Sequence, residues 1–241
     1  SGFHERPRQM KINIVIQARL SSSRFPRKIF SEIRGKKIID YVIETSLSVI
    51  GRNQVIVVIP ESENELKLYL SNKYNNIVLL TGHMTDVRSR FVDALLNYPC
   101  DAFIRVCADN PLLQPKFLED LIEYYNETNL AYIYNDSRRE SNDNFVDGFG
   151  AELVDSQLFL KSLEDITPLV KEHVTYTIAK FNNGIIHASP IVEKYISNLT
   201  LDVNTEEDFS WIKKKLEENQ GIDIYNPEEL LVLFEKKNSS N

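Results

Sequence analysis

One segment of the sequence, from Gln17 to Lys28, combines hydroxyl and cationic side chains in a way that suits a triphosphate. Three serines stand among its cations, which are Arg19, Arg24, Arg27 and Lys28. A triphosphate needs positive donors and hydroxyl or N–H groups around oxygens that gain charge when the α-phosphate is attacked. Arg24 and Lys28 are suitable side chains for this role. A solvated basic loop is the alternative, because a phosphate loop without glycine is not diagnostic.

A second candidate is Asp109, which stands in the run Arg-Val-Cys-Ala-Asp-Asn-Pro from Arg105 to Pro111. The carboxylate follows an apolar stretch that reads as a buried strand, and the proline turns the chain after it. Mg²⁺ prefers carboxylate and phosphate oxygens, so Asp109 is suited to bridge a triphosphate to the protein through that ion. The alternative is a turn residue or a helix N-cap.

A third acidic run, from Leu201 to Asp208, again leads from an apolar stretch into a helix start. Carboxylates stabilise the positive N-terminus of a helix, so this run by itself is more often structural than catalytic. Alone, it does not predict a site.

Short apolar runs alternate with helical patterns along most of the chain, which is typical of βαβ units. Apolar runs predict strands at 12–16, 54–59, 77–80, 102–106, 132–135, 151–154, 185–190 and 199–203. Helical spacing of apolar residues predicts helices at 37–50, 63–72, 86–98, 206–219 and 228–237. One more helix is expected to start in the stretch flanked by Pro111 and Pro115.

These elements predict an α/β fold with a doubly wound, mostly parallel, Rossmann-like sheet and a small mixed β subdomain. We expect residues 10–241 to form one domain, with the mixed part at roughly 130–195. Residues 1–9 are expected to be a floppy lead-in or tag remnant, and the polar loop at 135–144 to be mobile. Ligands of such folds bind at the carboxyl ends of the strands, where the first loop and Asp109 would meet.

Composition excludes several classes of protein. The 28 basic and 35 acidic residues give a net charge of -7, opposite to the footprint of a nucleic-acid binder. No apolar run approaches the roughly 20 residues that cross a bilayer, and no signal core opens the chain. Cys100 and Cys107 cannot make a disulfide framework, and zinc-ligand spacing, GxxxxGK[ST] and GxGxxG are all missing. We therefore expect a cytoplasmic protein without nucleic-acid or membrane partners.

Five ordered segments resemble the cytidylyltransferase family that includes CMP-Kdo synthetases and, more closely, SpsF-like surface-polysaccharide proteins. The matches are 17–28 with QARxGSxRLPGK, 86–91 with DVLxRF, 107–111 with xADxP, Asp147, Gly148 and Glu152 with DG…E, and 171–174 with REHV. The resemblance as a whole spans nearly the whole chain, and five ordered matches are far more specific than one.

The resemblance implies an enzyme that transfers a nucleoside monophosphate from CTP to a sugar, a sugar acid, or a sugar or polyol phosphate. Pyrophosphate leaves, Mg²⁺ is the cofactor, and a homodimer is the expected assembly. The nucleotide would be held by Gln17, Ala18, Arg19, Ser22, Arg24, Lys28, Asp86 and Arg90. Catalysis would rest on Arg24, Lys28 and Asp109, and the acceptor would face Glu152, Lys171 and His173. For His173, packing or capping its helix is the alternative.

Two departures from the family pattern affect the site. Arg27 stands where the family has a glycine, and Asn204 stands where its DTPED segment has a second metal carboxylate. The metal ligands would be Asp109 and Asn204, or Asp202 in place of Asn204 with altered geometry. An amide ligates through its oxygen but lacks the charge. Two other functions therefore stay open: a catalytically degenerate nucleotide-binding partner protein, and the same chemistry with another nucleotide such as GTP.

Overall fold

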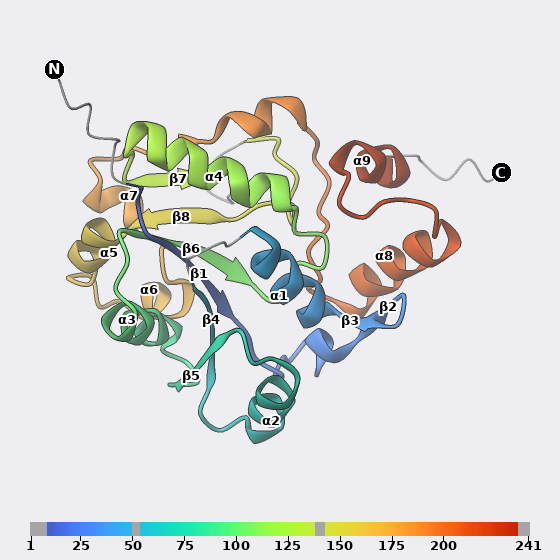
Figure 1. Ribbon diagram of the computed structural model, residues 1–241, viewed down its shortest axis with the longest axis horizontal. Helices are drawn as coiled ribbons and strands as arrows, with labels where there is room; N and C mark the ends of the chain where they lie inside the picture. The colour runs from blue at the N-terminus through green and yellow to red at the C-terminus, as the bar shows by residue number, and fades with distance from the viewer. Residues whose placement is uncertain (1–8, 50–53, 138–142, 236–241) are drawn as a thin grey trace, which may run out of the picture.

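The computed structural model describes residues 9–49, 54–137 and 143–235. Within these ranges a seven-stranded sheet has the order β5-β4-β1-β6-β8-β7-β9 and runs through the middle of the molecule (Figure 1). Its bounds are β1 Ile12–Gln17, β4 Val55–Pro60, β5 Val78–Gly82, β6 Ala102–Cys107, β7 Tyr132–Tyr134, β8 Glu152–Asp155 and β9 His187–Ala188. The α/β class and the mostly parallel sheet are confirmed.

The inner strands of the parallel part, β1, β4 and β6, are buried on both faces because helices cover each side. β1 pairs in parallel with β4 and β6, and β4 with β5. Every residue of β4 is buried, which explains its uninterrupted apolar run. β8 then pairs antiparallel with β6 and β7, so the mixed part continues the same sheet.

Two layers of helices pack on the sheet. One core cluster joins it to α1 (Ile38–Val49), α2 (Asn64–Lys73) and α4 (Pro115–Thr128). The other joins its opposite face to α3 (Val87–Asn97), α5 (Ser156–Ser162) and α7 (Ile178–Phe181). None of the described helices is long and apolar enough to cross a membrane.

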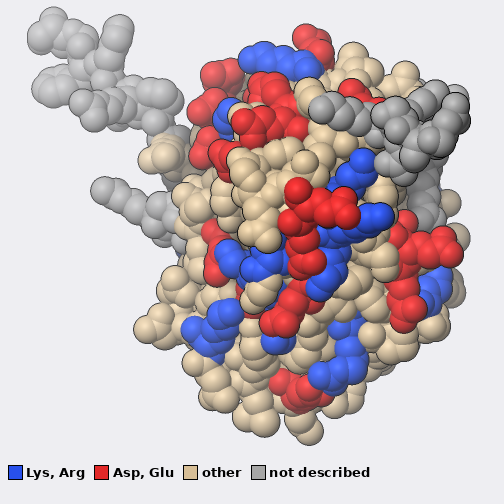
Figure 2. Space-filling model, turned by 90° about the vertical axis from the view of Figure 1, so that its right-hand side faces the viewer, with Lys and Arg blue, Asp and Glu red and all other residues tan. Residues whose placement is uncertain are grey.

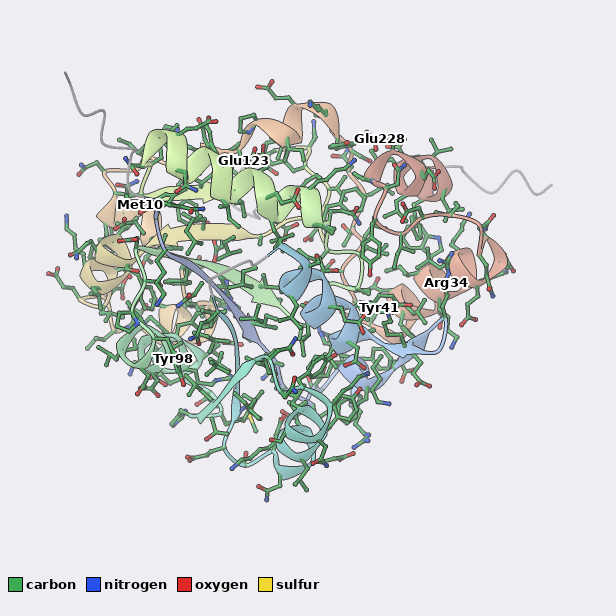
Figure 3. All side chains as sticks on the ribbon, viewed as in Figure 1. Met10, Arg34, Tyr41, Tyr98, Glu123 and Glu228 are labelled. Atoms are coloured by element: carbon green, nitrogen blue, oxygen red, sulfur yellow. The ribbon has the colours of Figure 1, made fainter. Side chains whose placement is uncertain are left out.

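A third core cluster lies beside the sheet and joins residues far apart in the sequence. It contains side chains of the hairpin β2 (Glu32–Ile33) and β3 (Lys36–Lys37), of α8 (Glu206–Glu218) and of α9 (Pro227–Glu235). Arg34, at the hairpin turn, donates hydrogen bonds to the carbonyl oxygens of Leu216, Asn219 and Ile222 (Figure 3). The bonds to Leu216 and Asn219 satisfy carbonyls that the end of α8 leaves free. The hairpin is thereby fixed to α8.

The surface on the side of α8, α9 and the hairpin carries both signs of charge. Lysine and arginine interleave with aspartate and glutamate over much of this face (Figure 2). Such a face lacks the continuous basic stripe that a nucleic-acid backbone requires.

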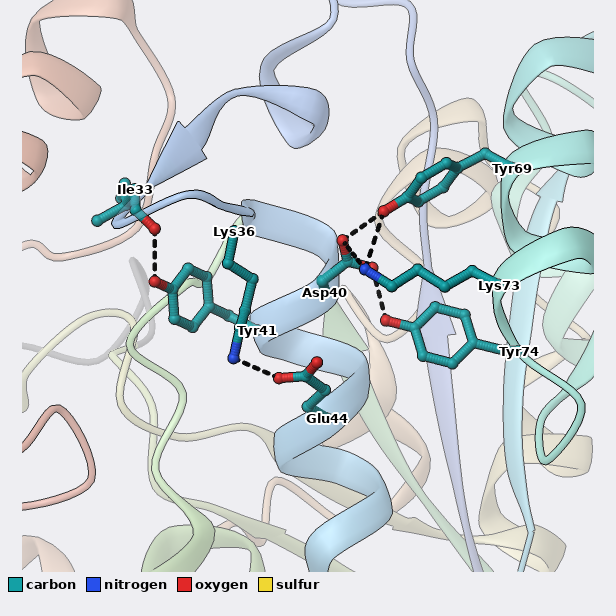
Figure 4. A network of polar contacts seen from close by, with 8 residues as sticks. All are labelled: Ile33, Lys36, Asp40, Tyr41, Glu44, Tyr69, Lys73 and Tyr74. Atoms are coloured by element: carbon teal, nitrogen blue, oxygen red, sulfur yellow. Dashed lines mark hydrogen bonds and ion pairs between the residues drawn. The ribbon is translucent and has the colours of Figure 1, made fainter.

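A buried carboxylate joins α1 to α2. The side chain of Asp40 is only 1% exposed and accepts hydrogen bonds from Tyr69, Tyr74 and Lys73 (Figure 4). Burial, together with the hydrogen bond to Asp40, raises the pKa of Tyr69 to about 12. Because both phenols stay protonated, they donate to the carboxylate and offset the cost of burying its charge.

Most predicted elements match the structure within two or three residues. The prediction of a strand at 199–203 is wrong, because Thr200 makes only an isolated bridge with Asp147. Leu201 and Val203 are buried in the third core cluster instead of a sheet, which accounts for the apolar alternation that suggested a strand. The predicted strand at 185–190 is reduced to His187–Ala188, and a 3-10 helix begins at Pro190.

Some predictions fall on residues outside the described ranges. These are the lead-in up to residue 8 and the part of the polar loop that holds Arg138, Arg139 and Glu140.

Replacing Asp40 by asparagine should lower the free energy of unfolding by about 2 kcal/mol, since charge-assisted hydrogen bonds in a buried site are lost. Urea denaturation followed by circular dichroism measures the change. Glu44→Gln on the same helix is the matched control, because the Glu44–Lys36 pair is more exposed and should contribute about 1 kcal/mol or less. Equal effects of the two substitutions would contradict the assignment.

Candidate active site

A cavity of about 600 Å³ opens at the carboxyl ends of β1 and β6. Its walls are the start of the loop after β1, the loop from β5 to α3, the end of β6, and α6 (Pro168–His173). Nine residues predicted for the site line it, namely Gln17, Ala18, Arg19, Lys28, Asp86, Arg90, Asp109, Lys171 and His173. The chain therefore brings the predicted nucleotide and acceptor segments to one cavity.

Other predicted residues do not line this cavity. Ser22 lines a second, shallower hollow of about 820 Å³, which also includes Arg19. Arg24 is exposed and lines neither hollow. Glu152, Asp202 and Asn204 lie outside the lining of both.

Lys28 and Asp109 form an ion pair in the cavity wall. Lys28 Nζ lies 3.0 Å from Asp109 Oδ2 and 3.0 Å from the carbonyl oxygen of Val203. The Val203 N–H in turn donates to the Asp109 carbonyl at 2.9 Å. The two charged side chains are 15% and 22% exposed, so water screens their attraction only in part. Three distant segments of the chain meet at this pair.

Asp202 lies close to this pair and is incompletely satisfied. Burial, followed by repulsion from Asp109, raises the pKa of Asp202. Its Oδ2 accepts a hydrogen bond of 2.7 Å from the side-chain amide of Asn204, while its buried Oδ1 has no hydrogen-bond partner among the described residues. Two neighbouring carboxylates with an unpartnered oxygen form a donor set that fits a divalent cation.

The rest of the acidic run caps a helix, as the sequence suggested. Asp208 Oδ2 accepts the N–H groups of Asn204 and Thr205, and the Thr205 hydroxyl accepts the N–H of Asp208. This reciprocal capping box begins α8. In the described part of the chain, no group of three or more His, Cys, Asp or Glu could hold a metal by itself. A cation held there would need oxygens from the substrate.

The loop from β5 to α3 forms another wall of the cavity. His83, which the sequence analysis missed, lines the cavity and accepts the backbone N–H groups of Thr85 and Asp86 at its Nδ1. Asp86 is the N-cap of α3 and accepts the N–H of Ser89. Its carboxylate therefore shapes this loop.

Arg90 is buried and braces the loops around the cavity. Its guanidinium donates to the carbonyl oxygens of Val58 at 3.2 Å and of Ala18 at 3.5 Å. Burial, followed by repulsion from Arg19, lowers the pKa of Arg90 to about 10. The contacts fix the backbone at Ala18, the residue predicted to contact the base.

Arg105 is a further cavity residue that the sequence analysis did not select. Its Nε donates to Gln17 Oε1 at 2.8 Å, and Nη1 donates to Glu152 Oε1 at 3.0 Å. Thr175 and Tyr132 also donate to Glu152, so this carboxylate is held within a polar network. The signal in the sequence was a charged residue inside a buried apolar strand.

Cys107 lines the cavity together with Arg105, but its thiol is not activated as a nucleophile. Burial raises the pKa of its thiol to about 12. A protonated thiol is a poor nucleophile, so nothing in its setting favours a covalent intermediate.

The end of α6 is bent sharply where it meets the cavity. Val174 has φ 52° and ψ -60°, a strained conformation for a β-branched residue, and the Thr175 N–H donates to the His173 carbonyl. Lys171 and His173 line the cavity before this turn, while Thr175 after it donates to Glu152. The turn thus connects the predicted acceptor side to the Arg105 network.

Several known proteins resemble this chain in sequence. The chain is 25% identical over 221 residues to an uncharacterized protein, MJ1063, of Methanocaldococcus jannaschii, covering 90% of this chain and 86% of that protein. It is 22% identical to the spore coat polysaccharide biosynthesis protein SpsF of Bacillus subtilis, covering 84% and 85%. A 3-deoxy-manno-octulosonate cytidylyltransferase of Vesicomyosocius okutanii is 26% identical over 117 residues, which span 47% of this chain and 46% of that protein.

Solved structures share the fold. A cytidylyltransferase from Leptospira borgpetersenii superposes with a TM-score of 0.78 at 21% identity, covering 96% of this chain and all of that one. A CMP:2-keto-3-deoxy-manno-octonic acid synthetase complexed with CTP gives 0.63 at 17% identity, covering 87% and 99%. The sequence profile of the cytidylyltransferases matches residues 13–182. By that match over most of its length, the chain belongs to the cytidylyltransferase family.

Proposed function

We propose that this protein transfers cytidine monophosphate from CTP to an anionic sugar-like acceptor, with Mg²⁺ as cofactor and pyrophosphate as the second product. The observation that carries the proposal is the Lys28–Asp109 pair, which sets a cation and a carboxylate side by side in a cavity at the carboxyl ends of the strands. In such a pair Lys28 can neutralise a phosphate charge, and Asp109 can hold a cation next to it.

The positions of the loop and cavity residues suggest which part of the nucleotide each would bind. Gln17 and Ala18 lie where the base would bind, and Arg19 and Lys28, which line the cavity, supply donors for the phosphates. Ser22 and Arg24 lie on the same loop outside the lining of this cavity and would add further donors. An acceptor oxygen would attack the α-phosphorus as pyrophosphate leaves, and the protein would mainly orient the two and stabilise the growing charge. Mg²⁺, when bound, would supply Lewis-acid stabilisation of the phosphate oxygens.

We propose Asp109 and Asp202 as the metal ligands, with Asn204 positioning Asp202. The support is the hydrogen bond from the Asn204 amide to Asp202 Oδ2 and the unpartnered Oδ1. This arrangement keeps two negative charges for the cation although the family's second carboxylate is replaced. It favours an active enzyme over the degenerate partner protein.

The acceptor would enter from the side of Lys171 and His173. Both are at least partly exposed, and both line the cavity together with Arg105. The positive charges of Lys171 and Arg105 suit an acceptor with a carboxylate or phosphate group. Because SpsF is named for polysaccharide biosynthesis, we extend that role to this protein and propose that it acts in the cytoplasm as a homodimer.

CTP with Mg²⁺ should raise the melting temperature of the protein more than GTP, UTP or ATP, because a ligand of the native state stabilises it. Differential scanning fluorimetry measures the shift, which Asp109→Ala should abolish. Asp93→Ala, an exposed carboxylate on α3, is the control and should leave it unchanged. A shift that favours GTP would change the assigned base, and no shift with any nucleotide would reject the proposal.

Asp202→Asn should remove the effect of Mg²⁺ on CTP binding, and Asn204→Ala should weaken it by about tenfold, as loss of a residue that orients a metal ligand typically does. Mg²⁺ titration at fixed CTP, followed by calorimetry, separates the two. If Asp202→Asn keeps its Mg²⁺ response while Asn204→Asp strengthens it, position 204 is the metal site.

A further inference from the structure

The N-terminal end of α2 contacts the predicted phosphate loop through two carboxylates, Glu63 at the N-cap and Glu65 in the first turn. Glu63 Oε2 accepts the N–H of Leu20 at 2.6 Å, and Oε1 accepts both the N–H and the hydroxyl of Ser21. Glu65 accepts two hydrogen bonds from the guanidinium of Arg27, at 2.6 and 2.7 Å. Glu63 thus holds the beginning of the loop and Glu65 holds its end.

The loop closes on itself between these two points. The Arg27 N–H donates to the Leu20 carbonyl at 2.9 Å. Arg27 has φ 60°, a left-handed conformation that ordinarily favours glycine, and its guanidinium is tied to Glu65. Arginine thus occupies the left-handed position at which the family has glycine, and its side chain takes part in an ion pair.

Glu63 is the stronger of the two contacts. Arg27 and Glu65 have side chains 55% and 56% exposed, so water screens that pair and it contributes little. Glu63 is half-buried and stands at the N-cap position of α2, yet its carboxylate makes no bond to its own helix. It accepts hydrogen bonds from Leu20 and Ser21 instead, so a charged side chain connects the start of α2 to the loop after β1.

The contact also determines which loop donors remain for a ligand. With the N–H groups of Leu20 and Ser21 taken by Glu63, those of Ser22, Ser23 and Arg24 are the next along the loop. In the described part of the chain no protein acceptor faces these three groups. These N–H groups remain available to a ligand, and successive N–H groups of a loop can together bind an anion.

We propose that Glu63 is a positioning residue that fixes the loop in the shape that binds the triphosphate, with Glu65 supporting its far end. The inference rests on the proposed function, because it assigns the phosphates to this loop. Without Glu63 the loop would have to be ordered by the nucleotide, and affinity would fall by the cost of that ordering.

The test compares Glu63→Gln with Glu61→Gln, which removes an equal charge from an exposed residue just before α2. Calorimetry with CTP and Mg²⁺ and with CMP measures both affinities. Glu63→Gln should weaken CTP about tenfold, as expected for one lost charge-assisted hydrogen bond, and change CMP much less. Glu61→Gln should behave as the parent protein. Glu63→Asp, which keeps the carboxylate, should recover part of the CTP affinity.

Unchanged or tighter CTP binding by Glu63→Gln would overturn the inference, since the carboxylate would then be idle or would compete with the phosphates. Equal loss of CTP and CMP affinity would also overturn it by indicating general damage. If the parent protein binds no nucleotide, the proposed function fails. Amide hydrogen exchange then decides on the positioning role: exchange at Leu20 and Ser21 must accelerate in Glu63→Gln and not in Glu61→Gln.

Discussion

The contact among Lys28, Asp109 and the Val203 carbonyl is the constraint on which the candidate site depends. It joins the end of the first loop, the turn after β6, and the segment that leads into α8. A lysine facing only solvent would leave Asp109 beside the half-buried Asp202, and two adjacent carboxylates repel each other strongly where water is scarce. The ammonium group offsets that repulsion in the ligand-free protein.

Networks on both sides of this contact keep the cavity in shape. Arg90 holds the backbone at Ala18 and Val58, and Arg105 holds Gln17 through its side chain. Both arginines donate mainly to protein groups, so they act on a ligand through the walls that they brace. Glu152 compensates the charge of Arg105 and at the same time ties β6 and β8 to the turn after α6. The nucleotide and acceptor walls are thus connected by polar contacts.

The sequence predicted the parallel half of the fold well, because buried β-branched runs and helical spacing carry strong periodic signals. Nine of the residues predicted for the site line one cavity, because strand ends in such sheets meet at one edge. The prediction erred at 199–203, where Leu201 and Val203 pack on helices and mimic a strand. Arg105 and His83 were missed, because their neighbours in space come from segments far away in the sequence. Asp202 is the carboxylate near Asp109, and the Asn204 side chain holds it there by a hydrogen bond. Residue spacing in the sequence does not predict such a side-chain contact.

The position of these contacts along the chain affects the order in which the protein can assemble. Lys28 and Val203 are separated by 175 residues, and Arg34 and Leu216 by 182. Closing such long loops is entropically costly, and contacts between distant residues tend to form late in folding. On the ribosome, β1, β4, β5 and β6 emerge well before α8. The core of the sheet is therefore available early, whereas the lysine that faces Asp109 acquires its last partner only when the final quarter of the chain has been synthesised.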